Sequence, residues 1–299
     1  MQSMALRIPC DAIAAVSAAK VRKLMNLPQS TAIDARGSGK PTPPSFFVEG
    51  VAINCEALLP TSARISNDCN SGSSFGVFTL NLDHVVKLRQ SPDFRAAYRT
   101  ARYVTADGFP IVWAGRLTGA NVGRVAGADL IEPLCAVAAR SNQPVFLFGG
   151  RFEALAGAAR HLVAQFPGLE IAGVYAPEAN FDPNSEHAVA YARLIAQSGA
   201  KICFVALGAP KQEYFAATAI NQTTGVAFVC IGAGLDFLAG VQTRAPRWIQ
   251  VACAEWLWRL LREPGRMARR YLDCLLVLPS VLFSSSVRQR FSARALWNR

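Results

Sequence analysis

The sequence lacks several patterns, each of which would assign the protein to a particular class, such as membrane, secreted or metal-binding proteins. No stretch approaches the roughly 20 apolar residues that a membrane-spanning helix needs, and the longest candidate, Leu275 to Phe283, contains Pro279. Arg7 and Asp11 interrupt the apolar core that a secretory signal would have. The eight cysteines form no C-x-x-C pair, and only three histidines could help to bind a metal. These absences predict a cytoplasmic protein with buried, reduced thiols and no metal site.

Two further absences concern nucleotides and nucleic acids. The chain has no G-x-G-x-x-G sequence, which argues against an NAD-dependent oxidoreductase. It also has none of the motifs typical of nucleic-acid-binding domains. A basic nucleic-acid-binding α/β protein still stands as an alternative, because the net charge is +11. A salt-sensitive complex with DNA or RNA would support that alternative.

Most of the positive charge lies near the C-terminus. From Arg244 onward there are eleven arginines against three acidic residues, so this segment carries +8 of the net +11. Tryptophans are interspersed among these arginines, at Trp248, Trp256 and Trp258. A basic, aromatic-rich segment predicts contact with a polyanion, which could be an anionic membrane surface, a lipid pyrophosphate or a nucleic acid.

From Phe75 onward, short apolar runs alternate with segments of helical spacing. The predicted strands are Phe75–Leu80, Tyr103–Thr105, Pro144–Phe148, Leu169–Tyr175, Lys201–Leu207 and Val226–Ile231. Continuously apolar strands that alternate with helices indicate a parallel sheet covered on both faces. We therefore predict an α/β fold, a Rossmann-like, doubly wound and mostly parallel sheet with a C-terminal helical arm.

The sequence divides into three parts. Residues 1–72 are predicted to form a variable, partly disordered N-terminal extension, because Ser30–Ser45 and Thr61–Ser74 have the composition of linkers. Residues 73–246 form the predicted α/β core. Residues 247–299 form an Arg-rich appendage, with helices expected over Arg247–Leu261 and Pro264–Leu278.

Polar residues follow the ends of the first two predicted core strands. In an open parallel sheet these ends meet at one edge, where ligands bind. Asp107 follows one strand and precedes Gly108, so it is either a general base or the cap of a helix that begins near Pro110. Thr79 and Asn81 share one face by alternation. They either bind a ligand or end the strand and cap the next helix.

The later strand ends carry glycine and further polar residues. Gly149 ends a strand before a helix, which suits contact with a phosphate. Lys211 is a candidate contact for a diphosphate, and Gln212 a hydrogen-bonding group in the same pocket. Gly234 and Asp236 open the next crossover, where they could hold a nucleotide or serve only the packing of a tight turn.

These motifs, in this order, resemble the WecG/TagA/CpsF glycosyltransferases (glycosyltransferase family 26). The resemblance covers roughly Phe75–Tyr271. The matching segments are T-L-N-L-D at Thr79–Asp83, A-D-G-F-P at Ala106–Pro110, V-A-L-G-A-P-K-Q-E at Val205–Glu213, L-D-F-L-A-G-V-Q-T-R-A-P-R-W at Leu235–Trp248 and A-E-W-L-W-R-L-L-R-E-P-G-R at Ala254–Arg266.

The resemblance implies specific roles for several residues. It makes Asp107 the catalytic base, adds Thr79 and Asn81 to the active site, and carries Gln212 over as a site residue. Family members also have a G-x-D sequence like the one that ends at Asp129. That aspartate could bind a ribose or sugar hydroxyl, or cap its helix.

The resemblance also implies a reaction and its partners. Members transfer a sugar from a UDP-sugar, with inversion, to a polyprenyl-diphosphate-linked saccharide at the inner face of the membrane. The expected product is an exopolysaccharide or another cell-surface polysaccharide, and the expected donor sugar is a hexose or an N-acetylhexosamine. The expected location is therefore the cytoplasmic face of the plasma membrane, with peripheral attachment. A homo-oligomer is compatible with the sequence.

The leaving diphosphate needs positive charge. Many metal-dependent sugar transferases hold a cation with a D-x-D sequence, and this chain has none. The sequence therefore predicts metal-independent transfer with no cofactor beyond the donor substrate, with Lys211, backbone N–H groups and arginines holding the phosphates. The predicted arginines of the appendage are Arg244, Arg247, Arg259, Arg262 and Arg266.

Overall fold

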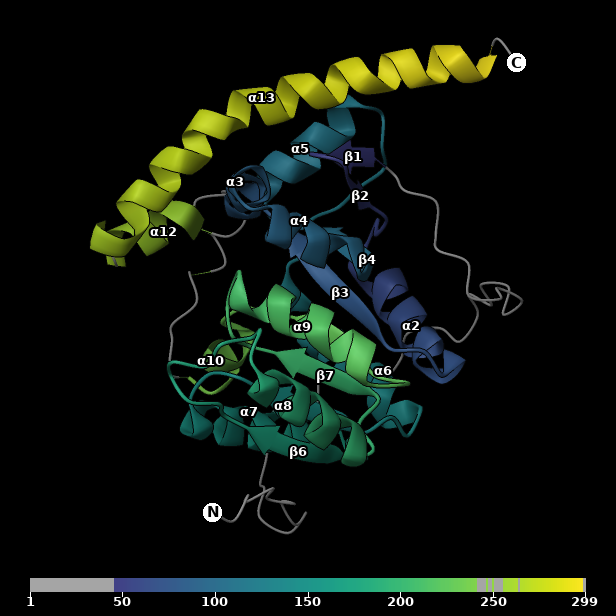
Figure 1. Cartoon of the computed structure of the whole chain (residues 1–299), viewed down its shortest axis with the longest axis vertical. Helices are drawn as coiled ribbons and strands as arrows, with labels where there is room; N and C mark the ends of the chain where they lie inside the picture. Colours follow the sequence, from purple (N-terminus) through teal and green to yellow (C-terminus); the bar gives the residue numbers. More distant parts are fainter. Residues whose placement is uncertain (1–45, 241–245, 247–248, 250–254, 263, 298–299) are drawn as a thin grey trace.

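The computed structural model describes residues 46–240, 246, 249, 255–262 and 264–297 (Figure 1). Its centre is a six-stranded sheet in the order β4-β3-β8-β7-β5-β6, in which every strand pair is parallel. The strands are β3 (Phe75–Leu80), β4 (Ala101–Ala106), β5 (Val145–Phe148), β6 (Ile171–Tyr175), β7 (Ile202–Val205) and β8 (Ala227–Cys230). The predicted Rossmann-like parallel sheet is confirmed.

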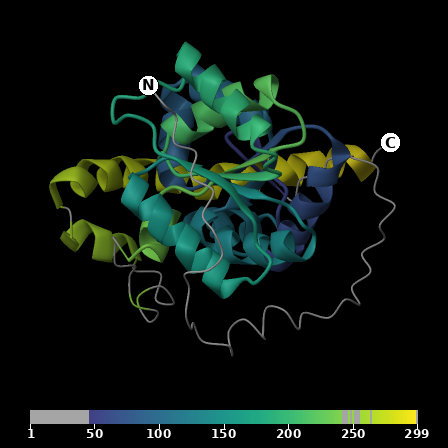
Figure 2. The ribbon, with the colours of Figure 1, turned by 90° about the horizontal axis from the view of Figure 1, so that it is seen from below.

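Helices cover both faces of the sheet, as Figure 2 shows from below. Alternate strand residues supply the two apolar cores: Phe146 and Phe148 pack on one side, and Val145 and Leu147 on the other. The first side holds α3 (Leu82–Gln90), α4 (Pro92–Arg99), α5 (Phe109–Leu117), α8 (Glu186–Gln197) and α9 (Lys211–Gln222). The second holds α2 (Leu58–Asp68), α6 (Gly127–Arg140), α7 (Phe152–Gln165) and α10 (Gly234–Leu238).

The folded part begins well before residue 72. A hairpin of β1 (Phe46–Val48) and β2 (Val51–Ile53) turns through Glu49 and Gly50, whose φ angles are +50° and +78°. Positive φ at both central residues is the signature of a tight two-residue hairpin turn. The linker predicted at Thr61–Ser74 is wrong, because α2 and a short 3-10 turn cover most of it. The polar composition misled the prediction, since the Ser and Thr side chains of α2 are buried against neighbouring elements.

The described cysteines are buried free thiols, as predicted. They are Cys55, Cys69, Cys135, Cys203, Cys230 and Cys274.

The C-terminal arm consists of α12 (Glu255–Arg262) and α13 (Pro264–Trp297), and α13 crosses one end of the molecule (Figure 1). The predicted end of this helix at Leu278 is wrong. Proline removes one backbone hydrogen bond; Pro279 lies on the exposed side of the helix, where water can replace that bond. Part of the helix predicted over Arg247–Leu261 lies outside the described residues.

The arm is fastened to the core by both apolar and polar contacts. Met267, Cys274 and Val281 of α13 are buried, and the helix contacts α3, α5 and β1. Arg270 forms an ion pair of 2.9 Å with Asp83 in the first turn of α3, and Lys87 binds the same carboxylate. The helices α3 and α5, together with β1, thus hold α13 against the core.

Candidate functional site

The first part of the site lies where β3 and β4 end. The backbone N–H of Asp107 donates to the carbonyl oxygen of Leu80 at 2.8 Å, so the two strand ends stay together. Asn81 follows β3, and its Nδ2 lies 3.4 Å from Oδ2 of Asp107 as a hydrogen-bond donor. The structure therefore brings these two predicted residues into direct contact at the carboxyl edge of the sheet.

The orientation of the Asn81 amide is set by the helix that follows. Asn81 is the N-cap of α3, and its Oδ1 accepts from the backbone N–H of His84 at 3.0 Å. Because the amide oxygen is engaged there, the NH₂ group is the one that faces Asp107. Both functions that the sequence left open for Asn81, cap and site residue, meet in one side chain.

Thr79 has a different place. Its side chain is buried, and its carbonyl oxygen lies 2.6 Å from both the Tyr98 hydroxyl and His84 Nδ1. Burial lowers the pKa of His84 to about 4, so the imidazole is neutral at pH 7. This cluster ties the end of β3 to α3 and α4, beneath the pair of Asn81 and Asp107.

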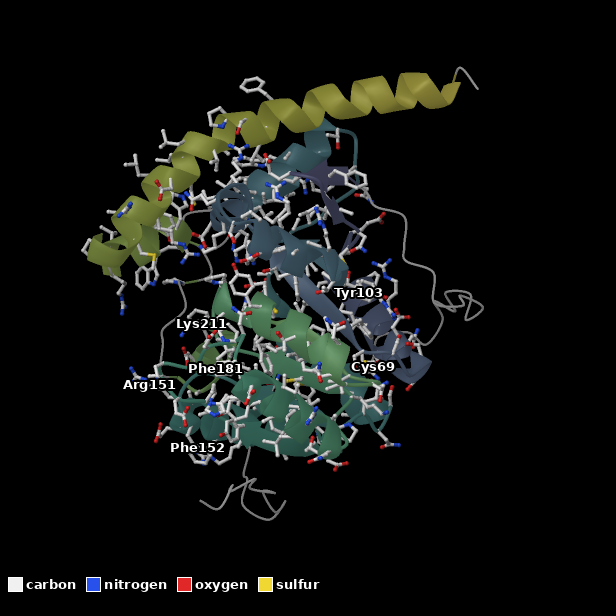
Figure 3. The ribbon with its side chains drawn as sticks, in the orientation of Figure 1. Cys69, Tyr103, Arg151, Phe152, Phe181 and Lys211 are labelled. Carbon is white, nitrogen blue, oxygen red and sulfur yellow. The ribbon has the colours of Figure 1, made fainter. Side chains whose placement is uncertain are left out.

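A cavity of about 190 Å³ opens at the ends of β5, β6 and β7. Lys211, the first residue of α9, is the basic residue in its lining, and Phe181 belongs to its apolar part (Figure 3). The lining residues are Gly150, Pro177, Glu178, Ala179, Phe181, Ala206, Leu207 and Lys211. A cavity of this size accommodates one part of a larger ligand.

Two of the predicted glycines, Gly149 and Gly234, leave no room for side chains. Gly149 has a φ of +103°, and a Cβ there would lie 2.8 Å from the backbone of Ala206. A Cβ on Gly234 would lie 2.7 Å from Ile131 Cδ1, where α10 packs on α6. At Gly234 the structure shows the packing of a tight turn, one of the two possibilities that the sequence left open.

Asp236 lies near Gly150, since its Oδ1 is 4.0 Å from the position of a Cβ on that glycine. Partial burial raises the pKa of its carboxyl group, and the charge of Arg151 opposes that shift. The structure thus adds Arg151 to the predicted residues of this region. Nothing in the sequence marked Arg151, because a single arginine before a helix is common on protein surfaces.

Asp129 lies in the first turn of α6 and does not cap it, because Ala126 is the N-cap. Its carboxylate forms an ion pair of 2.8 Å with Arg124, which the sequence analysis also missed. Val125, which follows Arg124 in the chain, donates its N–H to the carbonyl oxygen of Ala106 at 2.8 Å. This bond brings the pair of Arg124 and Asp129 to the end of β4, next to Asp107.

Gln212 is almost fully buried, with 3% of its surface exposed. Its Oε1 accepts from the N–H of Gly232 at 3.0 Å, and its Nε2 donates to Glu213 at 2.8 Å. Its amide therefore binds two groups of the protein itself.

The arginines predicted for the arm are only partly described. Arg244 and Arg247 lie outside the described residues, as do the side chains of Arg259 and Arg266, which belong to α12 and α13. Arg262 is exposed, and its guanidinium lies 4.7 Å from the centre of the Trp258 ring. Within the described part of the chain, no helix is long and apolar enough to cross a bilayer.

A comparison with protein-family models decides the relationship. Residues 47–295 match the model of the glycosyl transferase WecG/TagA/CpsF family. The chain belongs to this family. It is a glycosyltransferase of cell-wall polysaccharide synthesis, with a sugar donor and an acceptor as its substrates. The match begins at the hairpin of β1 and β2, well before the residue-75 start of the resemblance seen in the sequence.

Proposed function

We propose that this glycosyltransferase moves a hexose or an N-acetylhexosamine from a UDP-sugar to a polyprenyl-diphosphate-linked saccharide. The product enters an exopolysaccharide or another cell-surface polysaccharide. The observation that carries the proposal is the carboxylate of Asp107, oriented by Asn81, on the same edge of the sheet as the cavity that Lys211 lines.

The spacing of these two places suits a nucleotide sugar. Three strand-to-strand steps separate β4, which precedes Asp107, from β7, which precedes Lys211. At the usual spacing of neighbouring strands this is about 14 Å. A single sugar cannot bridge that distance, whereas an extended nucleoside-diphosphate sugar can. We assign the cavity to the nucleotide end and Asp107 to the sugar end.

In the proposed reaction, Asp107 takes the proton of the acceptor hydroxyl as its oxygen attacks the anomeric carbon. The bond between that carbon and the diphosphate breaks, and UDP leaves with the electron pair. A single displacement of this kind inverts the anomeric centre. General-base catalysis of such a step contributes about 10²- to 10⁴-fold to the rate.

The leaving diphosphate gains negative charge in this step. Lys211 supplies a positive charge in the cavity, Arg151 another near Asp236, and the arginines of the arm are further candidates. We propose that these groups stabilise the departing UDP without a metal ion.

A thermal-shift experiment tests the nucleotide site. At about 100 times its Kd, UDP is expected to raise Tm by roughly 5 °C or more, with or without EDTA. Lys211→Ala should weaken UDP binding about tenfold, because a charge-assisted contact is lost. The matched control is Lys201→Ala, at the opposite end of β7, which should leave UDP binding unchanged.

The same experiment separates the competing functions. An equal response to NAD or to an oligonucleotide, or a UDP response that disappears in EDTA, would contradict the proposal.

We further propose that the arm attaches the enzyme peripherally to the inner face of an anionic membrane. The outer side of α13 exposes large apolar side chains at helical spacing, while the opposite side packs on the core. The exposed residues are Leu272, Leu275, Leu276 and Phe283. An apolar stripe on a basic helix is the pattern of a helix that lies in a membrane surface.

Replacing Leu272, Leu275 and Leu276 together by serine is expected to weaken binding to anionic liposomes by more than tenfold, because the lost apolar burial is worth several kcal/mol. Flotation of the full chain with vesicles measures this. Substitution is preferable to deletion, since the inner side of α13 is part of the core. The control, Phe152→Ser on α7, removes an exposed apolar side chain outside the arm. Parent-like flotation of the triple variant would exclude this attachment.

A further inference from the structure

One buried carboxyl group close to the candidate site takes no part in the reaction proposed above. Glu213, in the first turn of α9, is fully buried. Its Oε1 accepts from Gln212, while its Oε2 has no hydrogen-bond partner among the described residues. A buried polar atom without a partner costs about 1–3 kcal/mol, more when charged. A fold that keeps such a group in the first turn of a helix indicates that the group has a function.

The hydrogen bond from Gln212 to Glu213 indicates what this function is. A glutamine amide can turn over, because its oxygen and nitrogen ends have the same shape. The carboxyl oxygen of Glu213 accepts a hydrogen bond, and the N–H of Gly232 donates one. These two partners together permit one orientation of the Gln212 amide, with Nε2 toward Glu213 and Oε1 toward Gly232.

The bond to Gly232 crosses from one element to another. Gly232 follows β8, which lies between β3 and β7 in the sheet, and has a φ of +57°. The turn that it begins leads into α10, which carries Asp236. The side chain of Gln212 is thus a strut between α9 and the turn from β8 to α10.

The geometry points to Glu213 as a positioning residue: it orients the amide of Gln212, which fixes the turn at Gly232 and with it the approach of Asp236 to the donor. The link to the donor rests on the proposed function. Glu213 itself touches no substrate.

The surroundings of Glu213 explain which substitutions are informative. Burial raises the pKa of Glu213 to about 7, while the hydrogen bond from Gln212 opposes that shift. The titratable or charged groups that act on it or feel its charge are Lys87 and Asp83 of α3, Tyr98 of α4 and Cys230 of β8. In either protonation state Oε1 can accept from Gln212, and the amide oxygen of a glutamine at position 213 can accept the same hydrogen bond.

Hydrogen exchange at Gly232 in the full chain tests the strut without any ligand. Glu213→Met keeps the size of the side chain and removes the acceptor, and it should speed exchange about tenfold, as should Gln212→Met. Glu213→Gln should exchange like the parent. Because Glu213 acts through Gln212, the double methionine variant should exchange no faster than Gln212→Met alone.

Gln143→Met is the matched control, since Gln143 is equally buried and hydrogen-bonded, but to Ser66 of α2. It should lose stability without faster exchange at Gly232.

Kinetics with the UDP-sugar provide the second measurement. Glu213→Met is expected to raise the donor KM about tenfold with kcat within about threefold of the parent, and Glu213→Gln to restore the parent KM. Parent-like exchange at Gly232 in Glu213→Met would overturn the positioning role, as would faster exchange with unchanged donor kinetics. If the parent neither binds UDP nor transfers sugar, the proposed function fails, while the exchange rates still decide whether the strut exists.

Discussion

Asp107→Asn is expected to slow sugar transfer by at least about 100-fold, because an amide cannot take the proton of the acceptor hydroxyl. The fold should be retained, since the backbone N–H of residue 107 still bonds to Leu80 and the new side chain has the same size. Initial rates with a synthetic polyprenyl-diphosphate glycoside and a panel of UDP-sugars measure the loss, and the panel also identifies the donor.

Two controls make this result specific. Asp93→Asn changes an exposed aspartate in the first turn of α4 and should leave the rate unchanged. Asp107→Asn itself should still be stabilised by UDP, since the nucleotide site proposed above is the cavity that Lys211 lines. Near-parent turnover in Asp107→Asn would remove this residue from the mechanism.

Asn81→Asp is expected to cost activity to a similar degree, although the variant changes a single group. Aspartate caps a helix as well as asparagine does, so α3 should remain intact. The donor that faces Asp107 at 3.4 Å is replaced by a second carboxylate. Two carboxylates this close favour sharing one proton, which neutralises the base.

Comparing Asn81→Asp with Asn81→Ser separates repulsion from the loss of a hydrogen bond. Serine also caps helices and brings no charge, so its loss should stay near tenfold. The loss in Asn81→Asp should be about 100-fold at pH 7 and should shrink as the pH rises and the shared proton leaves. Equal rates for the two variants at all pH values would show that repulsion has no part.

The sequence was most informative where local pattern and fold agree. The strands β3, β5, β7 and β8 are mostly apolar runs buried along their whole length, and all six core strands were predicted near their observed bounds. The hairpin and α2 were missed because three-residue strands and a Ser-rich helix carry little periodic signal. Pro279 was misjudged for a related reason, since only the tertiary arrangement shows that it faces solvent.

The site was predictable to the level of the strand ends and no further. The rule that polar residues gather at the carboxyl edge of a parallel sheet predicted Asn81, Asp107 and Lys211. It could not show that Thr79 and Gln212 are buried, because the direction of a side chain at a strand end or in a first helical turn depends on its neighbours. Arg124 and Arg151 were not predicted as site residues, because only the fold shows that they interact with Asp129 and Asp236.

None of the described residues that line the cavity belongs to α12 or α13. In Figure 3, Lys211 and Phe181 lie near mid-height, below the beginning of α13, and the rest of that helix crosses the upper end of the molecule. With the attachment proposed above, UDP can dissociate and a new donor molecule can bind on the aqueous side while the arm stays bound to the lipid. We therefore expect an enzyme molecule that has bound to a vesicle to complete many transfers before it dissociates. A dilution chase would show this as several products per bound enzyme.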